Sequence, residues 1–204
     1  FVGNFHLVGF LFFLSAVTAL AHIIYALNIN GVYVRTVLNK QQNPWRWYEY
    51  SITASITVVV IAAVDGIRIT TFLASLALTT AGLMLQGGAV ERALVVEGTT
   101  WRSRSVWEPT LAGWVLLMSV WVPILYQYFR SLADIHDDGS ITKDFPLFVS
   151  FIIIGEVLLF CCFGVVQLWH IIAKPRYERV EVVYIFLSFI AKGLLVILIF
   201  SGFL

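Results

Sequence analysis

The sequence predicts an all-α protein, a polytopic bundle of membrane-spanning helices that forms a single domain over residues 1–204. Hydrophobic residues make up 60% of the chain and charged residues only 12%, about half of the charged share in a soluble domain. The mean hydropathy is +0.89. Several apolar stretches also reach the roughly 20 residues that a helix needs to cross a bilayer. This composition excludes an ordinary soluble enzyme and a disordered module.

Six spans are expected in chain order, at about residues 4–27, 45–64, 68–88, 109–129, 146–173 and 182–203. Five of them contain an apolar stretch long enough by itself. The second contains a short uncharged stretch, 50–64, and must recruit the preceding turn from Pro44, which suits a first helical position. That extension brings Glu49 into the membrane. Gly87 and Gly88 are expected to end the third span.

The loops between these spans predict the orientation of the chain. Loops 28–46, 87–108 and 174–181 lie on one side and carry nine basic residues, whereas loops 65–68 and 130–144 carry three. Positively charged loops stay in the cytoplasm, so the C-terminus is expected outside it. The nine residues are Arg35, Lys40, Arg46, Arg92, Arg102, Arg104, Lys174, Arg176 and Arg179.

Three ionisable residues fall inside the spans: Lys192, Glu49 and Glu156. A charge near the bilayer centre costs about 2.5–3.5 kcal/mol on insertion scales, so such groups are usually paired and functional. A buried lysine can act as a nucleophile toward a carbonyl group. Lys192 and Glu49 have similar depths and can form a pair, and Ser188 lies on the face of Lys192, four residues earlier. The alternative is an ion pair with only a structural role.

A histidine at similar depth adds to this group. Ser15, Thr18, His22 and Tyr25 form one polar stripe, and Glu49, Thr53 and Thr57 form another. We expect His22 either to accept a proton or to serve as an ordinary interhelical hydrogen-bonding group.

Other classes of site are not indicated. The net charge is +1 without a basic tract, so nucleic acid is not an expected partner. Cys161 and Cys162 are adjacent and form no disulfide framework. Metal-ligand spacings, phosphate loops and hydrolytic triads are not found, so neither a metal site nor an enzyme is expected.

A central lysine in the last span and a carboxylate on an earlier helix resemble a retinal-binding rhodopsin. Microbial pumps typically have aspartate four residues before the lysine, where this chain has Ser188. The segment RW-x-EYS around Glu49, LS-x-x-AK ending at Lys192, and the closing IFSG are similar to heliorhodopsins. That family has seven helices and an inverted topology with the C-terminus outside. Glu49 then falls on the third helix and His22 on the second, and the first helix is expected to be missing or truncated before Phe1. Alternatively, His6 is the first-helix histidine.

The resemblance implies a set of roles. Lys192 would carry all-trans-retinal as a protonated Schiff base, Glu49 would be the counterion, and Ser188 would hydrogen-bond nearby. His22 would lie in a polar cytoplasmic-side cavity. Trp121, Phe160 and Phe163 would form walls of the retinal pocket. The family also implies a homodimer.

Glu156 is a departure from the family, whose sixth helix is apolar in this region. It lies on a stripe with Phe160, Phe163 and Gln167, and it either closes a helix contact as a protonated carboxyl or belongs to a proton path.

Three hypotheses for the function follow. The first is a photosensory receptor in which light-driven isomerisation moves the Schiff-base proton and signals to an unknown partner. The second is a light-gated proton channel or transporter that uses Glu156, Glu49 and His22. The third is a retinal-free transporter.

Overall fold

The computed structural model describes residues 4–137 and 147–202, and these form six long helices. All six are long and apolar enough to cross a membrane, and the described ranges contain no strand. The expected helical membrane bundle is therefore confirmed. The helices are α1 (Asn4–Leu27), α2 (Pro44–Val64), α3 (Thr70–Leu94), α4 (Arg104–Asp137), α5 (Leu147–Ala173) and α6 (Tyr177–Gly202), and two short helical turns, η1 (Ile29–Gly31) and η2 (Val34–Leu38), connect α1 to α2.

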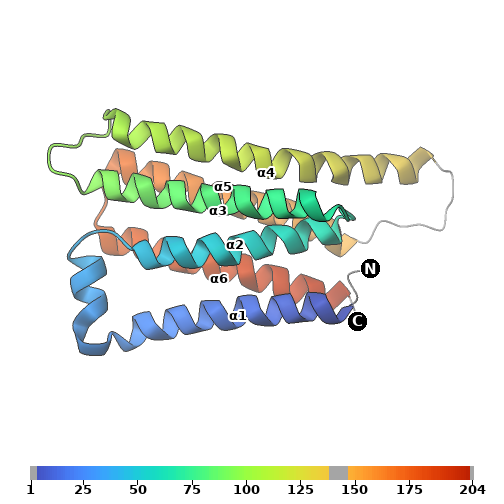
Figure 1. Cartoon of the computed structure of the whole chain (residues 1–204), viewed down its shortest axis with the longest axis horizontal. Helices are drawn as coiled ribbons and strands as arrows, with labels where there is room; N and C mark the ends of the chain where they lie inside the picture. The colour runs from blue at the N-terminus through green and yellow to red at the C-terminus, as the bar shows by residue number, and fades with distance from the viewer. Residues whose placement is uncertain (1–3, 138–146, 203–204) are drawn as a thin grey trace.

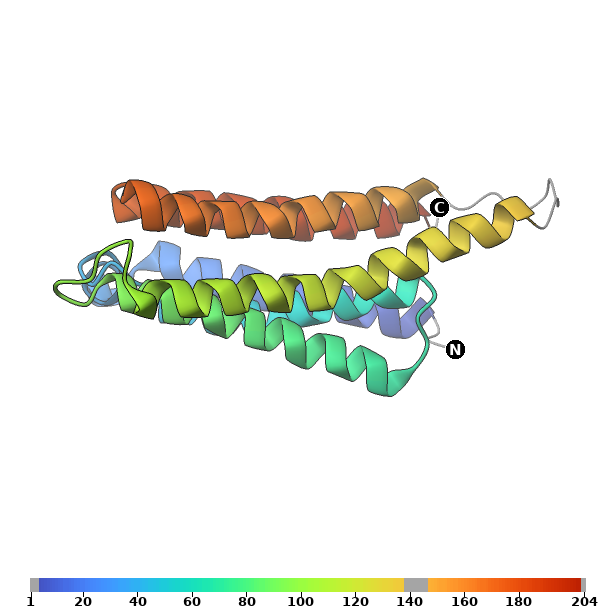
Figure 2. The ribbon, with the colours of Figure 1, turned by 90° about the horizontal axis from the view of Figure 1, so that it is seen from above.

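The six helices form two layers. In one layer α1, α2, α3 and α4 lie side by side in chain order (Figure 1). The second layer is the α5–α6 pair, which stands apart from the first layer in the perpendicular view (Figure 2). The main core lies between the layers and contains fully buried side chains from both, such as Ile61 and Ile124 from the first and Ile153 and Leu195 from the second.

Helix α2 begins where the sequence predicts it. Pro44 occupies its first turn, and the side chain of Asn43 caps the helix by accepting a hydrogen bond from the Arg46 backbone N–H at 3.1 Å. Glu49 therefore lies inside the helix, in its second turn.

Helix α3 does not end at Gly87 and Gly88 but continues to Leu94, so that expectation is wrong. The missing side chains let the indole of Trp47 lie directly against the α3 backbone, because a Cβ on Gly87 would come within 2.8 Å of Trp47 Cε3. The two glycines serve close helix packing rather than helix termination.

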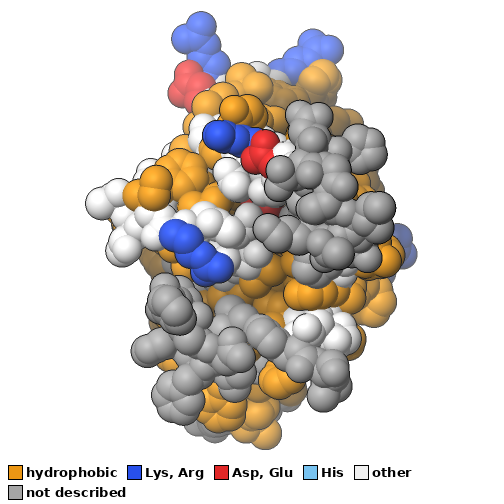
Figure 3. Space-filling model, turned by 90° about the vertical axis from the view of Figure 1, so that its right-hand side faces the viewer, with side chains coloured by type: hydrophobic (Ala, Val, Ile, Leu, Met, Phe, Trp, Pro, Cys, Tyr) orange, Lys and Arg blue, Asp and Glu red, His pale blue; other side chains and the backbone are white. Residues whose placement is uncertain are grey.

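Large apolar side chains are exposed along the outside of the bundle, among them Phe12, Leu78, Val115 and Ile197. In the end-on view of Figure 3, apolar side chains make up much of the described surface, and the charged side chains are scattered. An outer surface of this kind is suited to lipid rather than to water.

Candidate functional site

Helices α2 and α6 bring Glu49 and Lys192 together inside the bundle. Lys192 Nζ lies 2.6 Å from Glu49 Oε1, and the two side chains are 13% and 9% exposed. A charge-assisted hydrogen bond of this length, largely shielded from water, is a strong one. The ion pair joins the two layers of the bundle.

Two threonines fix the carboxylate in place. Thr18 from α1 donates to Glu49 Oε1 at 3.1 Å, and Thr53 from the next turn of α2 donates to the same oxygen at 3.0 Å. With Lys192, three donors from three helices converge on one oxygen. The two polar stripes noted in the sequence therefore meet at Glu49.

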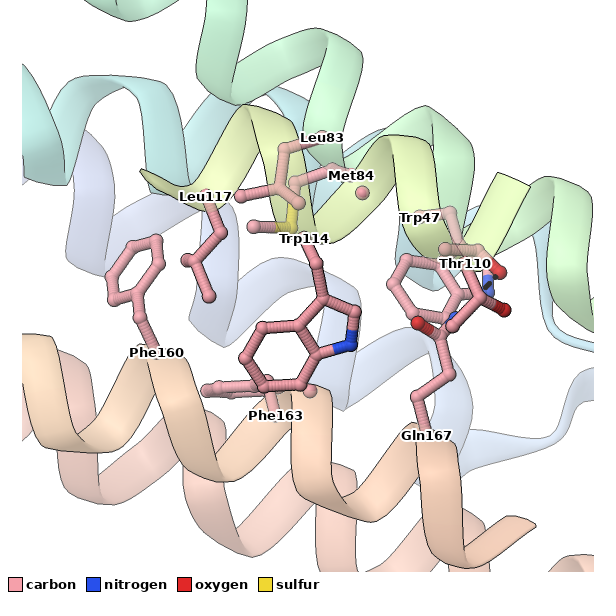
Figure 4. A pocket seen from close by; sticks show the side chains of 12 residues that line it. Trp47, Leu83, Met84, Thr110, Trp114, Leu117, Phe160, Phe163 and Gln167 are labelled. Carbon is pink, nitrogen blue, oxygen red and sulfur yellow. Dashed lines mark hydrogen bonds between the residues drawn. The ribbon is translucent and has the colours of Figure 1, made fainter. Parts of the chain in front are cut away.

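A small cavity of about 30 Å³ adjoins Lys192, with walls that are mostly apolar and aromatic. It adjoins a second hollow of about 50 Å³, and Met84, Phe160 and Phe163 line both. Figure 4 shows this second hollow, with Trp114 and Phe163 lying next to each other in its wall and Gln167 reaching toward Trp47 and Thr110. Together the two hollows follow the boundary between the layers, from Lys192 toward α3 and α4.

The other expected pocket residues lie close to this space. Ser188 is fully buried and lines the cavity beside Lys192. Trp121 does not line either hollow but packs edge-to-face on Phe160, at 5.2 Å between ring centroids. Its indole N–H is buried without a hydrogen-bond partner among the described residues.

These residues fit a retinal group by their chemistry. A primary amine stands at the head of an aromatic space that runs between the helices, and apolar lining with few polar groups suits a polyene. With volumes of about 30 and 50 Å³, the two hollows are smaller than such a ligand. Among the described residues no group of three His, Cys, Asp or Glu side chains is placed to hold a metal ion.

The structure places His22 next to the ion pair but not on it. Its Nδ1 donates to the backbone carbonyl of Thr18 at 2.8 Å, and its ring lies 4.5 Å from that of Phe189. Thr18 donates to Glu49 through its side-chain hydroxyl, so the histidine and the carboxylate contact different groups of the same threonine. Its proton-accepting role stays a prediction. The side chain of His6 is outside the described part of the structure.

Glu156 is completely buried, and neither of its carboxyl oxygens has a hydrogen-bond partner among the described residues. It lies one helical turn from Phe160 on α5. The two hollows near Lys192 are lined by other residues. A carboxyl group in such surroundings is stable only when it is protonated. Its place in a proton path stays a prediction.

Sequence reasoning missed a second buried charge cluster, formed by Arg46, Glu91 and Glu181. Arg46 is 2% exposed and pairs with both glutamates, at 2.5 Å from Glu91 Oε1. Each carboxylate also accepts hydrogen bonds from uncharged groups. The donors to Glu91 are Asn43 N, Trp47 Nε1 and Tyr177 Oη. The donors to Glu181 are Asn43 Nδ2, Tyr33 Oη and Tyr177 Oη.

The expectation that Arg46 and Glu91 lie in loops is wrong, because they lie within α2 and α3. A signal was present in the sequence. Arg46, Glu91 and Glu181 all follow or precede an apolar run at the same end of the bundle, so their depths match.

A bundle of membrane-spanning helices that buries a lysine–carboxylate pair beside an aromatic cavity places this protein in the class of rhodopsin-like membrane proteins. The sequence model of the heliorhodopsin family matches residues 4–204. The chain therefore belongs to the heliorhodopsin family, which implies a membrane protein that binds retinal and senses light. A search of curated proteins finds no match.

Proposed function

We propose that the protein is a photoreceptor in which all-trans-retinal is attached to Lys192 and Glu49 is the counterion. The observation that carries the proposal is the 2.6 Å contact between Lys192 Nζ and Glu49 Oε1 at the head of an aromatic space. Retinal, held as a protonated Schiff base, supplies visible absorption and a light-driven isomerisation. The protein supplies the surroundings of the Nζ proton.

In this proposal Glu49 holds the proton on Lys192 Nζ in the dark, because its negative charge stabilises the positive nitrogen. Thr18 and Thr53 keep the receiving oxygen in position. Retinal, when bound, would supply a change in the direction of this N–H bond, and Glu49 Oε1, which contacts Nζ, would be the group placed to receive the proton. On the α1 side His22 would be a further titratable group, with its Nδ1 donating to the backbone carbonyl of Thr18 while the Thr18 hydroxyl donates to Glu49. Ser188 lies beside the nitrogen and can hydrogen-bond in the same space.

We also propose that the arginine-rich end of the bundle faces the cytoplasm and that the C-terminus is outside. Because Arg46 is buried, it no longer counts among the basic residues of the loops. The arginine-rich end then has eight basic residues and the opposite end has three. The bias therefore persists. A homodimer and an unidentified signalling partner complete the proposal, on the strength of the family alone.

The test is the visible absorption spectrum of the purified full chain after all-trans-retinal is added, measured in parallel for Lys192→Ala and for Lys174→Ala, an exposed lysine. We expect a visible band in the wild type and in Lys174→Ala and no band in Lys192→Ala. The absence of a band in folded wild-type protein would refute the photoreceptor proposal. A retinal-free transporter, with Lys192 as a substrate-binding charge, would then be favoured.

A second candidate function is light-gated proton conduction. The fully buried, unpaired carboxyl of Glu156 favours it, because an intramembrane acid without a structural partner is usually functional. In this candidate the proton passes between Glu156, Lys192 Nζ, Glu49 and His22. Light-evoked current across a planar bilayer or a cell membrane measures it, and Glu156→Gln should abolish the current, whereas Glu108→Gln at an exposed site should not. An unchanged current in Glu156→Gln, or the absence of current in the wild type, would refute this candidate.

A further inference from the structure

The connector between α1 and α2, residues 28–43, has an irregular backbone. Asn28, Asn30 and Gln41 have φ angles of 39°, 55° and 52°, a left-handed region that asparagine tolerates and that is unfavourable for glutamine. The connector also contains the π-helical turn η2. Hydrogen bonds within the segment, such as the one from Val34 N to Asn28 Oδ1, support its local shape, and contacts with the bundle fix its position.

One side-chain hydrogen bond ties the middle of the connector to α6. The hydroxyl of Tyr33 donates to Glu181 Oε1 at 3.0 Å, and its ring lies 5.2 Å from that of Tyr25 on α1. Burial and the neighbouring Glu181 raise the pKa of Tyr33, so the hydroxyl keeps its proton and remains a donor. Glu181 is itself fixed by Arg46 and by Asn43 at the far end of the connector.

The connector closes one end of a groove that leads to Glu49. The groove has a volume of about 550 Å³ and runs between α1, the connector and the start of α2, with walls that include Ala21, Tyr33, Thr36 and Glu49. Its open flank carries the exposed apolar side chains of Leu20, Ile24 and Trp45, which suit lipid. The connector covers the remaining end, which faces out of the bundle where α1 and α2 are joined (Figure 1).

We propose that residues 28–43 form a lid over the groove that leads to Glu49, and that the hydrogen bond from Tyr33 to Glu181 holds this lid closed. Opening the lid admits water to the carboxylate and lets Glu49 exchange protons with the solution. The inference rests on the proposed function for the role of Glu49 as counterion and for the attachment of retinal to Lys192.

The placement of Glu181 connects the lid to Lys192. Both residues lie on α6, 11 positions apart, which is about 16 Å along the axis at 1.5 Å per residue. A rotation or shift of α6 that follows a change at Lys192 therefore moves the acceptor of the lid's hydrogen bond. Light absorbed near the middle of this helix can then release the lid at its N-terminal end.

Hydrogen–deuterium exchange of the full, retinal-free chain in lipid nanodiscs tests the lid, with Tyr33→Phe compared with Tyr48→Phe. Tyr48 is exposed on α2, so its variant removes a hydroxyl without touching the connector. Loss of a hydrogen bond to a charged acceptor should accelerate exchange of the connector amides about 10-fold. Exchange in Tyr33→Phe equal to that in Tyr48→Phe would overturn the proposal.

A labelling experiment gives a second readout, and the comparison that can overturn the lid is made without Tyr33→Phe. Ala21→Cys places a thiol in the groove under the lid, and a membrane-impermeant maleimide reports its access to water against the background of Cys161 and Cys162. We expect slow labelling in the otherwise wild-type chain and several-fold faster labelling when Tyr33→Phe is added. Labelling in the wild-type background as fast as at Asn39→Cys, an exposed connector position outside the groove, would overturn the lid. The visible band, measured separately, decides the proposed function.

Discussion

Arg46→Gln removes the only cation of the buried Arg46–Glu91–Glu181 cluster among the described residues. Arg46 is 2% exposed and the two glutamates are 3% and 2% exposed, so water cannot replace the lost charge. Removing one partner of a buried ion pair costs about 3–5 kcal/mol. The glutamine amide can replace a donor but not the positive charge. For a chain of about 200 residues each kcal/mol shifts the melting temperature by about 2–4 °C, so we expect a fall of about 6–20 °C.

The assay is thermal unfolding of the detergent-solubilised protein, followed by tryptophan fluorescence and by recovery of monodisperse protein. Arg130→Gln is the matched control, because Arg130 faces Asp134 at 3.9 Å on the surface with both side chains more than half exposed. Such a pair is worth under about 1 kcal/mol. If Arg46→Gln melts within about 2 °C of the control, which corresponds to less than about 1 kcal/mol, the cluster does not hold the helices together and the reasoning is wrong. A triple variant that also carries Glu91→Gln and Glu181→Gln should recover part of the loss, because it leaves no unpaired charge.

Two further predictions concern stability. Asp65 follows α2, is buried, and has no partner for either carboxyl oxygen among the described residues, and this burial raises its pKa from 3.8 to about 7. Between about pH 4 and pH 7 the native state therefore holds a proton that the unfolded chain has lost, so the unfolding free energy falls as pH rises through this window and levels off above it. Asp65→Asn should remove this pH dependence and melt at a higher temperature than wild type at pH 8. Thermal unfolding with the same pH dependence in both proteins would contradict this. Gly87→Ala should destabilise the protein by about 1–3 kcal/mol, because the new Cβ would clash with the Trp47 indole. Gly82→Ala on the same helix is the control, because its Cβ would meet nothing nearer than 3.8 Å and the substitution should be neutral or slightly stabilising. Equal melting temperatures for the two variants would refute the role of Gly87 in helix packing.

The sequence was sufficient to anticipate the bundle and the residues at its centre. Lys192, Glu49 and Glu156 stand out because ionisable groups are rare in apolar spans, and depth along a helix can be counted at 1.5 Å per residue. Counting places Lys192 and Glu49 at one level, and the structure brings them into contact. Glu156 could be located in the same way, but whether it had a partner depended on packing that no spacing reveals.

The burial of Arg46 and the packing at Gly87 were harder to predict, because matching depth alone does not show which helices surround these residues. An arginine two residues into a helix near a loop has the pattern of an interfacial charge, and only Glu91 and Glu181, 45 and 135 residues away, make it a buried one. A Gly-Gly pair has the pattern of a helix end, and only Trp47 lying against it explains why α3 continues. Trp121 shows the same limit, since its contact with Phe160 places it behind the cavity wall rather than in it.

The division of the bundle into an α1–α4 layer and an α5–α6 pair has a consequence for biosynthesis. The chain is made from the N-terminus, so α1 to α4 can assemble around Glu49 before the last two helices leave the ribosome. The final hairpin then enters the bilayer carrying Lys192, whose insertion as a lone charge costs about 2.5–3.5 kcal/mol. Docking onto the finished layer cancels that cost when Lys192 meets Glu49 at 2.6 Å. A chain whose first layer is misassembled leaves the lysine without its carboxylate, so the cost of inserting the charge is not offset.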